Sequence, residues 1–405
     1  MPTVTSVDRS AFDDALAAAR EHSVTSDVAR TLIRAIDGEQ LEALMQAAAE
    51  VRDRLKGRTI TYSKKVFIPL TNLCRDYCGY CTFRKDPGRP GARTMTPDEV
   101  LSVAEAGARL GCKEALFSLG DRPEAIFPEM RDALARLGHR TTLSYLAEMC
   151  ERVLNETGLL PHSNPGLMAR RDLETLREFN PSLGLMLENV SERLTLAGMP
   201  HDNAPDKPPA LRLKTIEEAG RLRIPFTTGI LIGIGETLDE RVDSLFAIRE
   251  LHERHGHIQE VIIQNFRAKP DIPMRDHPEP ALTDLARTIA VARLTLGDMN
   301  VQAPPNLSDD RYPFLVGAGL NDWGGISPLT PDHINPEKPW PHIDSLAERT
   351  EAAGYELRER LCVYPEFVGR EEFLGSGLAS RVRRLADGRG YAKTFERTTA
   401  LGVMA

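Results

Sequence analysis

Three of the chain's six cysteines stand close together, in the stretch CRDYCGYC. Cys74, Cys78 and Cys81 have the spacing C-x3-C-x2-C, and thiolates are soft ligands that select zinc, copper(I) or iron–sulfur clusters. A structural zinc site takes four ligands, yet no histidine stands between His22 and His139. Ordinary iron–sulfur clusters also use four cysteines. The loop therefore predicts either a structural metal site completed by a distant ligand, or a cluster with one iron left open.

The composition limits the classes of function that the chain can have. Hydrophobic residues make up 41% of the 405 residues, which is enough for a sizeable core. The net charge of -8 argues against sequence-independent binding to nucleic acid, which needs a basic surface. We find no secretory signal and no apolar stretch near the roughly 20 residues that span a bilayer. We therefore expect a cytoplasmic protein with reduced thiols and with neither nucleic acid nor membrane as partner.

The elements that must position the cysteine loop follow a βα pattern. Eight short apolar runs alternate with longer helix-like stretches, which predicts a TIM-type (β/α) barrel in the α/β class. A six-unit partial barrel with appended segments is the alternative. We expect an N-terminal helical layer over 1–58, the barrel over 59–375 and a basic C-terminal tail or linker over 376–405. The eight runs cover residues 65–70, 114–119, 157–162, 183–190, 226–234, 260–266, 297–304 and 314–320.

Polar segments follow each predicted strand. The cysteine loop follows the first run, and segments such as GDRPE, HSNPG, ENVSER and NDWGGIS follow later runs. Active sites of such barrels lie where strands end and βα-loops begin. We therefore expect one site at this end of the barrel.

The cysteine spacing in this context resembles that of the radical S-adenosylmethionine (SAM) enzymes. The resemblance implies that Cys74, Cys78 and Cys81 hold a 4Fe-4S cluster whose fourth iron binds SAM. An external electron donor supplies one electron, and the resulting 5′-deoxyadenosyl radical removes a hydrogen atom from a small-molecule substrate. The cofactor carries the chemistry, and the protein positions it. A non-catalytic metal-binding module is the alternative from another class.

The same resemblance implies further SAM contacts near the cysteine loop. Tyr80 stands where the family has an aromatic residue beside the adenine, although an ordinary half-buried tyrosine is the alternative. Gly120 and Asp121 stand where the family has Gly-Gly-Glu, which binds the methionine amino group. The sequence departs from that pattern, but Asp121 keeps an acceptor near the position.

Two later segments complete the expected cofactor set. Glu188 would accept hydrogen bonds from the ribose, with Ser191 and Arg193 near the methionine end; a helix N-cap is the alternative for Ser191. GILIGIGE is similar to the family's G-x-I-x-G-x-x-E pattern and contributes Gly233 and Glu236. The alternative for that glutamate is an acid in the first turn of a helix, where it favours the helix dipole.

The resemblance extends to one member family. VFIPLTNLCRDYCGYCTFR, LPHSNPG, LMLENVSERL and GGISPLTPDHINPEKPWP resemble the ring-closing subunit of 7,8-didemethyl-8-hydroxy-5-deazariboflavin synthase. This implies a substrate made of a 4-hydroxybenzyl group joined to a diaminouracil with a ribityl chain. Its ring closes with loss of ammonia, and a companion radical SAM synthase, separate or fused, supplies it. The companion subunit itself and an aminofutalosine-type synthase are the alternatives among enzymes.

Such a substrate needs many neutral donors and acceptors, because buried polar groups must be paired. His162 and Asp322 are the candidates for a catalytic proton donor to the departing amine. Trp323 would cover an aromatic ring or lie in the core. The remaining thiols are expected to be inert core residues, namely Cys112, Cys150 and Cys362. The polar residues expected on the active face are His162, Asn164, Asn265, Asn306, Asp322 and Ser327, with Asn265 also a candidate for cofactor binding.

Overall fold

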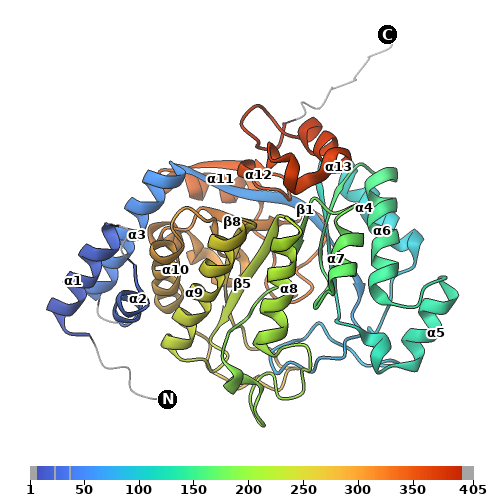
Figure 1. Ribbon diagram of the computed structural model, residues 1–405, viewed down its shortest axis with the longest axis horizontal. Helices are drawn as coiled ribbons and strands as arrows, with labels where there is room; N and C mark the ends of the chain where they lie inside the picture. Colours follow the sequence, from blue (N-terminus) through green and yellow to red (C-terminus); the bar gives the residue numbers. More distant parts are fainter. Residues whose placement is uncertain (1–6, 22–23, 36–37, 395–405) are drawn as a thin grey trace.

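A closed barrel of eight parallel strands forms the centre of the molecule in the computed structural model, which describes residues 7–21, 24–35 and 38–394 (Figure 1). β1 pairs with β2 on one side and with β8 on the other, which closes the barrel. The predicted TIM-type barrel is therefore confirmed, and the partial barrel is excluded. The eight barrel strands are β1 (Thr59–Thr71), β2 (Glu114–Leu119), β3 (Leu160–Asn164), β4 (Ser182–Gly184), β5 (Phe226–Ile232), β6 (Ile258–Asn265), β7 (Val301–Gln302) and β8 (Asp322–Ile326). A ninth parallel strand, β9 (Glu356–Arg360), pairs with the first residues of β1.

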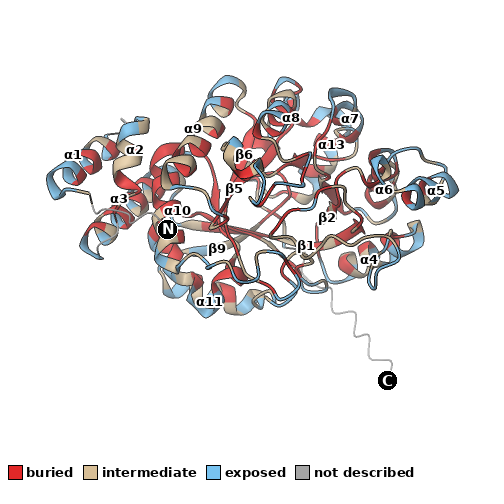
Figure 2. Cartoon of the chain, turned by 90° about the horizontal axis from the view of Figure 1, so that it is seen from below, coloured by how far each residue is buried: buried red, intermediate tan, exposed pale blue. Residues whose placement is uncertain are grey.

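Helices surround the barrel, with buried faces toward the strands and exposed faces outward (Figure 2). Two of them, α4 and α9, begin at capping boxes in which a threonine and a glutamate satisfy free backbone N–H groups. None of the helices in the described ranges is long and apolar enough to cross a bilayer. The helices after β1 are α4 (Pro97–Arg109), α5 (Pro128–Arg136), α6 (Thr142–Glu156), α7 (Arg170–Leu176), α8 (Pro209–Arg221), α9 (Leu238–His255), α10 (Leu282–Leu296), α11 (Ile343–Ala352), α12 (Pro365–Val368) and α13 (Glu371–Leu385), with 3-10 segments η1 (Pro123–Ala125), η2 (Glu192–Thr195) and η3 (Pro305–Ala318).

The N-terminal helical layer is present as α1 (Arg9–Arg20), α2 (Ser26–Leu32) and α3 (Gly38–Lys56). These helices lie together at one side of the barrel (Figure 1), where α3 packs on α10 and η3 and α2 packs on α9. Phe12, Leu32 and Leu44 are buried and belong to the same apolar core as the barrel. The layer therefore extends the barrel core.

The eighth predicted strand is wrong in position. The run at 314–320 lies mostly in η3, and β8 follows it at Asp322–Ile326. The apolar residues of the run, such as Leu315 and Val316, pack as part of the core without pairing in the sheet. The true strand reads DWGGI, and its two glycines remove the apolar alternation that a strand normally shows.

The expected basic tail over 376–405 is wrong for its described part, which ends at residue 394. Most of α13 falls in this stretch, and Leu378, Ala379 and Val382 are buried against the segment 361–368. The many arginines in this stretch make the helical spacing of its apolar residues difficult to recognise in the sequence. The carbonyl of Cys362 accepts hydrogen bonds from side chains at the amino ends of β4 and β6. The C-terminal segment therefore closes the end of the barrel opposite the cysteine loop.

Candidate active site

A cavity of about 370 Å³ occupies the interior of the barrel and opens at the carboxyl ends of the strands. Cys74, Cys78 and Cys81 line its mouth, and His162 and Arg360 line its deeper part. Residues from most strands of the barrel contribute to this one cavity, as expected for a site at this end of such a fold.

The cysteine loop is held in place by the backbone. The N–H of Gly79 donates to the carbonyl of Pro200 at 2.8 Å, and the N–H of Gly120 donates to Thr71 at 2.9 Å. Gly120 is required here, because a Cβ at this position would lie 1.9 Å from the carbonyl oxygen of Leu73. Sequence reasoning assigned this glycine to cofactor binding, and the structure gives it a clear role in the close approach of two loops.

The three thiols fit a group bound by three thiolates. None of them forms a disulfide. The N–H groups of Asp76 and Asp121 point at Cys74 Sγ, at 3.4 and 3.2 Å, and such bonds stabilise a thiolate ligand. Burial raises the pKa of Cys74, and that of Cys78 to about 12, and a bound metal cation would favour the ionised form of such thiols.

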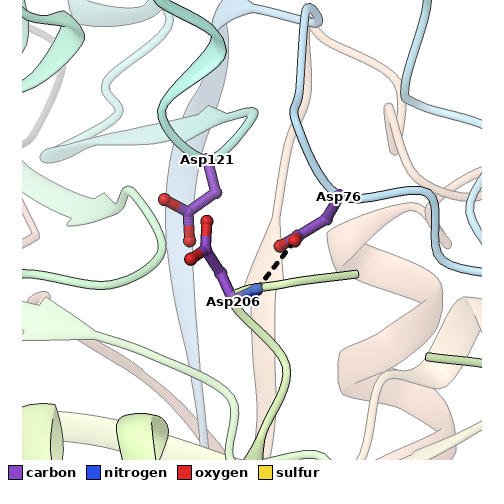
Figure 3. A group of neighbouring side chains, drawn as sticks. All are labelled: Asp76, Asp121 and Asp206. Carbon is purple, nitrogen blue, oxygen red and sulfur yellow. Dashed lines mark hydrogen bonds between the residues drawn. The ribbon is translucent and has the colours of Figure 1, made fainter. Parts of the chain in front are cut away.

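An acidic group lies directly beside this loop (Figure 3). Carboxylate oxygens of Asp76, Asp121 and Asp206 lie within 4.8 Å of one another, and the N–H of Asp206 donates to Asp76 at 2.9 Å. Arg75 approaches Asp206 at 2.8 Å, and Arg122 bonds both Asp121 and Asp206. Burial and the charge of Asp206 raise the pKa of Asp121 to about 7. The group joins three loops and has its own arginines, so it stabilises the position of the cysteine loop.

Glu188 and Tyr80, two of the expected cofactor contacts, line the cavity. Glu188 has a positive φ of 65° and is fixed by backbone bonds to β5. Its carboxylate accepts from Lys207 at 2.6 Å. Burial alone would raise the pKa of Glu188, but Lys207 and Arg212 outweigh burial and lower it. The hydroxyl of Tyr80 bonds the ring of His201 at 3.0 Å. The site thus has a buried carboxylate next to two cations.

Four predicted cofactor contacts do not line the cavity. Ser191 and Arg193 donate to Glu240, at 2.5 and 2.7 Å, and so join their loop to the start of α9. Glu236 accepts from the N–H groups of Gly233 and the next residue, at 2.7 and 2.8 Å. The geometry gives these residues a part in shaping the loops beside the cavity.

The two predicted proton donors have different surroundings. His162 lines the cavity, and its Nδ1 lies 2.7 Å from the hydroxyl of Ser182. Burial lowers the pKa of His162 to about 4, so the ring is neutral at neutral pH and is not an imidazolium acid. Asp322 lies at the amino end of β8, away from the cavity lining. Its carboxylate accepts from Arg360 at 2.6 Å and from the N–H of Gly324 at 2.5 Å, so a structural role explains it.

The other polar residues expected on the active face also fall into two groups, those that line the cavity and those that bond to other parts of the fold. Asn164 and Asn265 line the cavity. Asn306 donates to Asp332, and Ser327 bonds Thr330 within its own turn. Trp323 is fully buried and donates to Thr350, so it is a core residue. All three remaining cysteines are buried, but Cys362 also lines the cavity floor.

Sequence reasoning missed a set of charged residues that the fold brings to the cavity. Lys207 and Arg212 come from a proline-rich stretch with no strand or motif. Lys65 and Glu114 stand in apolar strands, where their facing direction follows only from the register. Alternation along the strands was the available signal, because inward-facing residues repeat every second position.

The barrel and its three-thiol loop define the class of radical SAM proteins. A family model described as the radical SAM superfamily matches residues 68–248, from β1 into α9. The chain is 50% identical over 334 residues to a 7,8-didemethyl-8-hydroxy-5-deazariboflavin synthase from Methanopyrus kandleri, covering 82% of this chain and 100% of that protein. The chain therefore belongs to the 7,8-didemethyl-8-hydroxy-5-deazariboflavin synthase family.

Other comparisons agree with this membership. The chain is 55% identical over 362 residues to an FO synthase from Streptomyces avermitilis, covering 86% of this chain and 42% of that protein. It thus spans about two fifths of the length of this relative. Among solved structures, HydG, a maturase of the [FeFe]-hydrogenase, has a TM-score of 0.71 at 15% identity and covers 87% of this chain and 77% of HydG. That likeness supports the fold alone.

Proposed function

We propose that this protein closes the ring of 7,8-didemethyl-8-hydroxy-5-deazariboflavin with loss of ammonia, as a carbon–nitrogen lyase. The substrate is the 4-hydroxybenzyl adduct of a diaminouracil that bears a ribityl chain. The observation that carries the proposal is that three thiols open onto one deep cavity inside the barrel, which has both apolar and polar lining residues. The relative from Methanopyrus kandleri, which the chain covers completely, is named for this product.

Cys74, Cys78 and Cys81 would hold a 4Fe-4S cluster, with SAM bound beside it. When bound, this group would supply a 5′-deoxyadenosyl radical, which would remove a hydrogen atom from the substrate. After ring closure and loss of ammonia, transfer of one further electron to a one-electron acceptor and of a proton to solvent would complete the deazaflavin. Glu188 offers a buried acceptor suited to ribose hydroxyls, and Lys207 offers a cation suited to the SAM carboxylate.

The proposal implies two partners. A companion radical SAM synthase, separate or fused, makes the adduct, and an external donor supplies the electron. We also infer a cytoplasmic location, because the six thiols of the described chain are all free.

Anaerobic reconstitution tests the proposal. We expect about four irons per chain, and fluorescent deazaflavin together with 5′-deoxyadenosine when adduct, SAM and a reductant are supplied. Cys74→Ala, Cys78→Ala and Cys81→Ala should each abolish both products. Cys112→Ala, a buried cysteine away from the cavity, is the matched control and should keep them. Formation of the adduct from its precursors, without ring closure, would instead assign the companion's reaction to this chain.

A further inference from the structure

The lower half of the cavity, between the cysteine loop and the C-terminal closure, is unusually polar. The interior of such barrels is normally packed with branched apolar side chains. Here five buried polar residues from five different strands line it. They are Lys65, Glu114, Glu260, Gln302 and Arg360.

The charges in this lower half are already matched within the protein. Lys65 pairs with Glu114 at 2.6 Å. Arg360 pairs with Glu260 at 3.0 Å and with Asp322 at 2.6 Å. Two cations thus face three carboxyl groups, so this region has no spare positive charge for an anionic ligand.

Gln302 is different, because its amide is not satisfied. Its Oε1 is buried without a hydrogen-bond partner, and its Nε2 lies at 3.5 Å, the outer limit, from the carbonyl of Trp323. A buried acceptor without a partner is costly, and a hydroxyl group of a ligand would satisfy it.

Two glycines of β8 make the space for these polar side chains. A Cβ on Gly324, which has φ +75°, would lie 2.2 Å from Gln302 Nε2. A Cβ on Gly325 would lie 2.4 Å from Lys65 Cε. β8 therefore has glycine, which has no side chain, at the two positions next to Gln302 and Lys65. This leaves room for both polar side chains inside the barrel, which indicates a recognition site.

We propose that the lower half of the cavity binds the uncharged ribityl chain of the substrate, with Gln302 accepting a hydrogen bond from one of its hydroxyl groups. This inference rests on the proposed function. The reacting part of the substrate must lie near the cysteine loop at the mouth, so the part that does not react extends downward. Binding energy from such a remote part positions the reacting atoms. A phosphate on the chain would meet Glu114 and Glu260 with no free cation to balance it.

Equilibrium binding to the reconstituted protein with SAM, under anaerobic conditions, tests the inference. The three probes are the ribityl-bearing diaminouracil, its 5′-phosphate, and an analogue with a methyl group in place of the ribityl chain. We expect the wild-type protein to bind the first probe at least about tenfold more tightly than either of the others, because each of the other two probes leaves a buried polar group without a partner.

Gln302→Met removes the amide at nearly constant volume. It should weaken binding of the ribityl probe about tenfold and leave binding of the methyl analogue unchanged. Gln46→Met, on the exposed face of α3, is the matched control and should change neither. If Gln302→Met does not fold, the three-probe comparison on the wild-type protein decides the question by itself.

Equal binding of the phosphorylated and free probes would overturn the inference. So would a Gln302→Met variant that weakens the methyl analogue as much as the ribityl probe. A wild-type protein that discriminates between the probes as expected, but makes no deazaflavin from the adduct, would disprove the proposed function alone. Deazaflavin formation without discrimination between the chains would disprove the ribityl assignment alone.

Discussion

Arg360 holds together the buried charges at the closed end of the barrel, so its removal should destabilise the fold. Its side chain is 2% exposed. It donates to Asp322 through Nε at 2.6 Å and Nη2 at 3.0 Å, and to Glu260 through Nη2 at 3.0 Å. Arg360→Met keeps most of the side-chain volume and removes these three bonds, together with the bond from Nη1 to the carbonyl of Leu361 at 3.0 Å. It leaves two buried carboxyl groups without their shared cation.

The magnitude follows from the burial of the group. Removing one partner of a buried ion pair typically costs about 3–5 kcal/mol, because the other partner stays uncompensated. Protonation of Glu260 reduces this cost, since burial already raises the pKa of that carboxyl. We therefore expect a loss near the lower end, about 3 kcal/mol. A typical domain has only about 5–15 kcal/mol of stability, so the change is large.

Urea unfolding followed by tryptophan fluorescence measures this loss, because Trp323 is buried next to Asp322. Arg358→Met is the matched control on the same strand. Its arginine pairs with Asp387 at 3.0 Å but is partly exposed, so we expect a loss of about 1 kcal/mol or less. Asp322→Asn combined with Arg360→Met should cost less than the sum of the two single variants, by at least about 1 kcal/mol. Equal losses in Arg360→Met and Arg358→Met would refute the reasoning.

Three further predictions concern the cavity and its mouth. Gly120→Ala should lower the iron bound per chain to less than about half, because the added Cβ meets the carbonyl of Leu73 and backbone atoms cannot move aside cheaply; full iron content would contradict this. Burial lowers the pKa of His162 from its usual 6.5 to about 4 in the fold. The shift therefore contributes about 3 kcal/mol to the free energy of unfolding above pH 6.5, and this contribution is lost as the pH falls toward 4. His162→Gln should therefore flatten the dependence of unfolding free energy on pH in that range, and an unchanged slope would count against it. Lys207→Met removes the cation 2.6 Å from Glu188 and should weaken SAM binding about tenfold, with iron content unchanged, as measured by equilibrium dialysis; unchanged SAM affinity would exclude a role for this lysine.

The fold class and the gathering of the three cysteines at one cavity could be predicted because their signals are local. A βα unit shows itself as a short apolar run followed by a helix, and most of the predicted runs overlap observed strands. The three cysteines stand in one loop, so their spacing along the chain already determines that they lie together. The presence of Glu188 and Tyr80 in the cavity lining could also be predicted, because both residues stand in segments that follow strand ends.

Only the tertiary structure decided which polar side chains enter the cavity. Lys65 meets Glu114 and Arg360 meets Asp322 through strand pairing and barrel closure, which no single segment encodes. Asp322 was expected in an active-site loop, but β8 begins at this residue and places it at the opposite end of the barrel. The physical reason is that the facing direction of a strand residue depends on register, and a shift of one position moves a side chain from the interior to the outer surface.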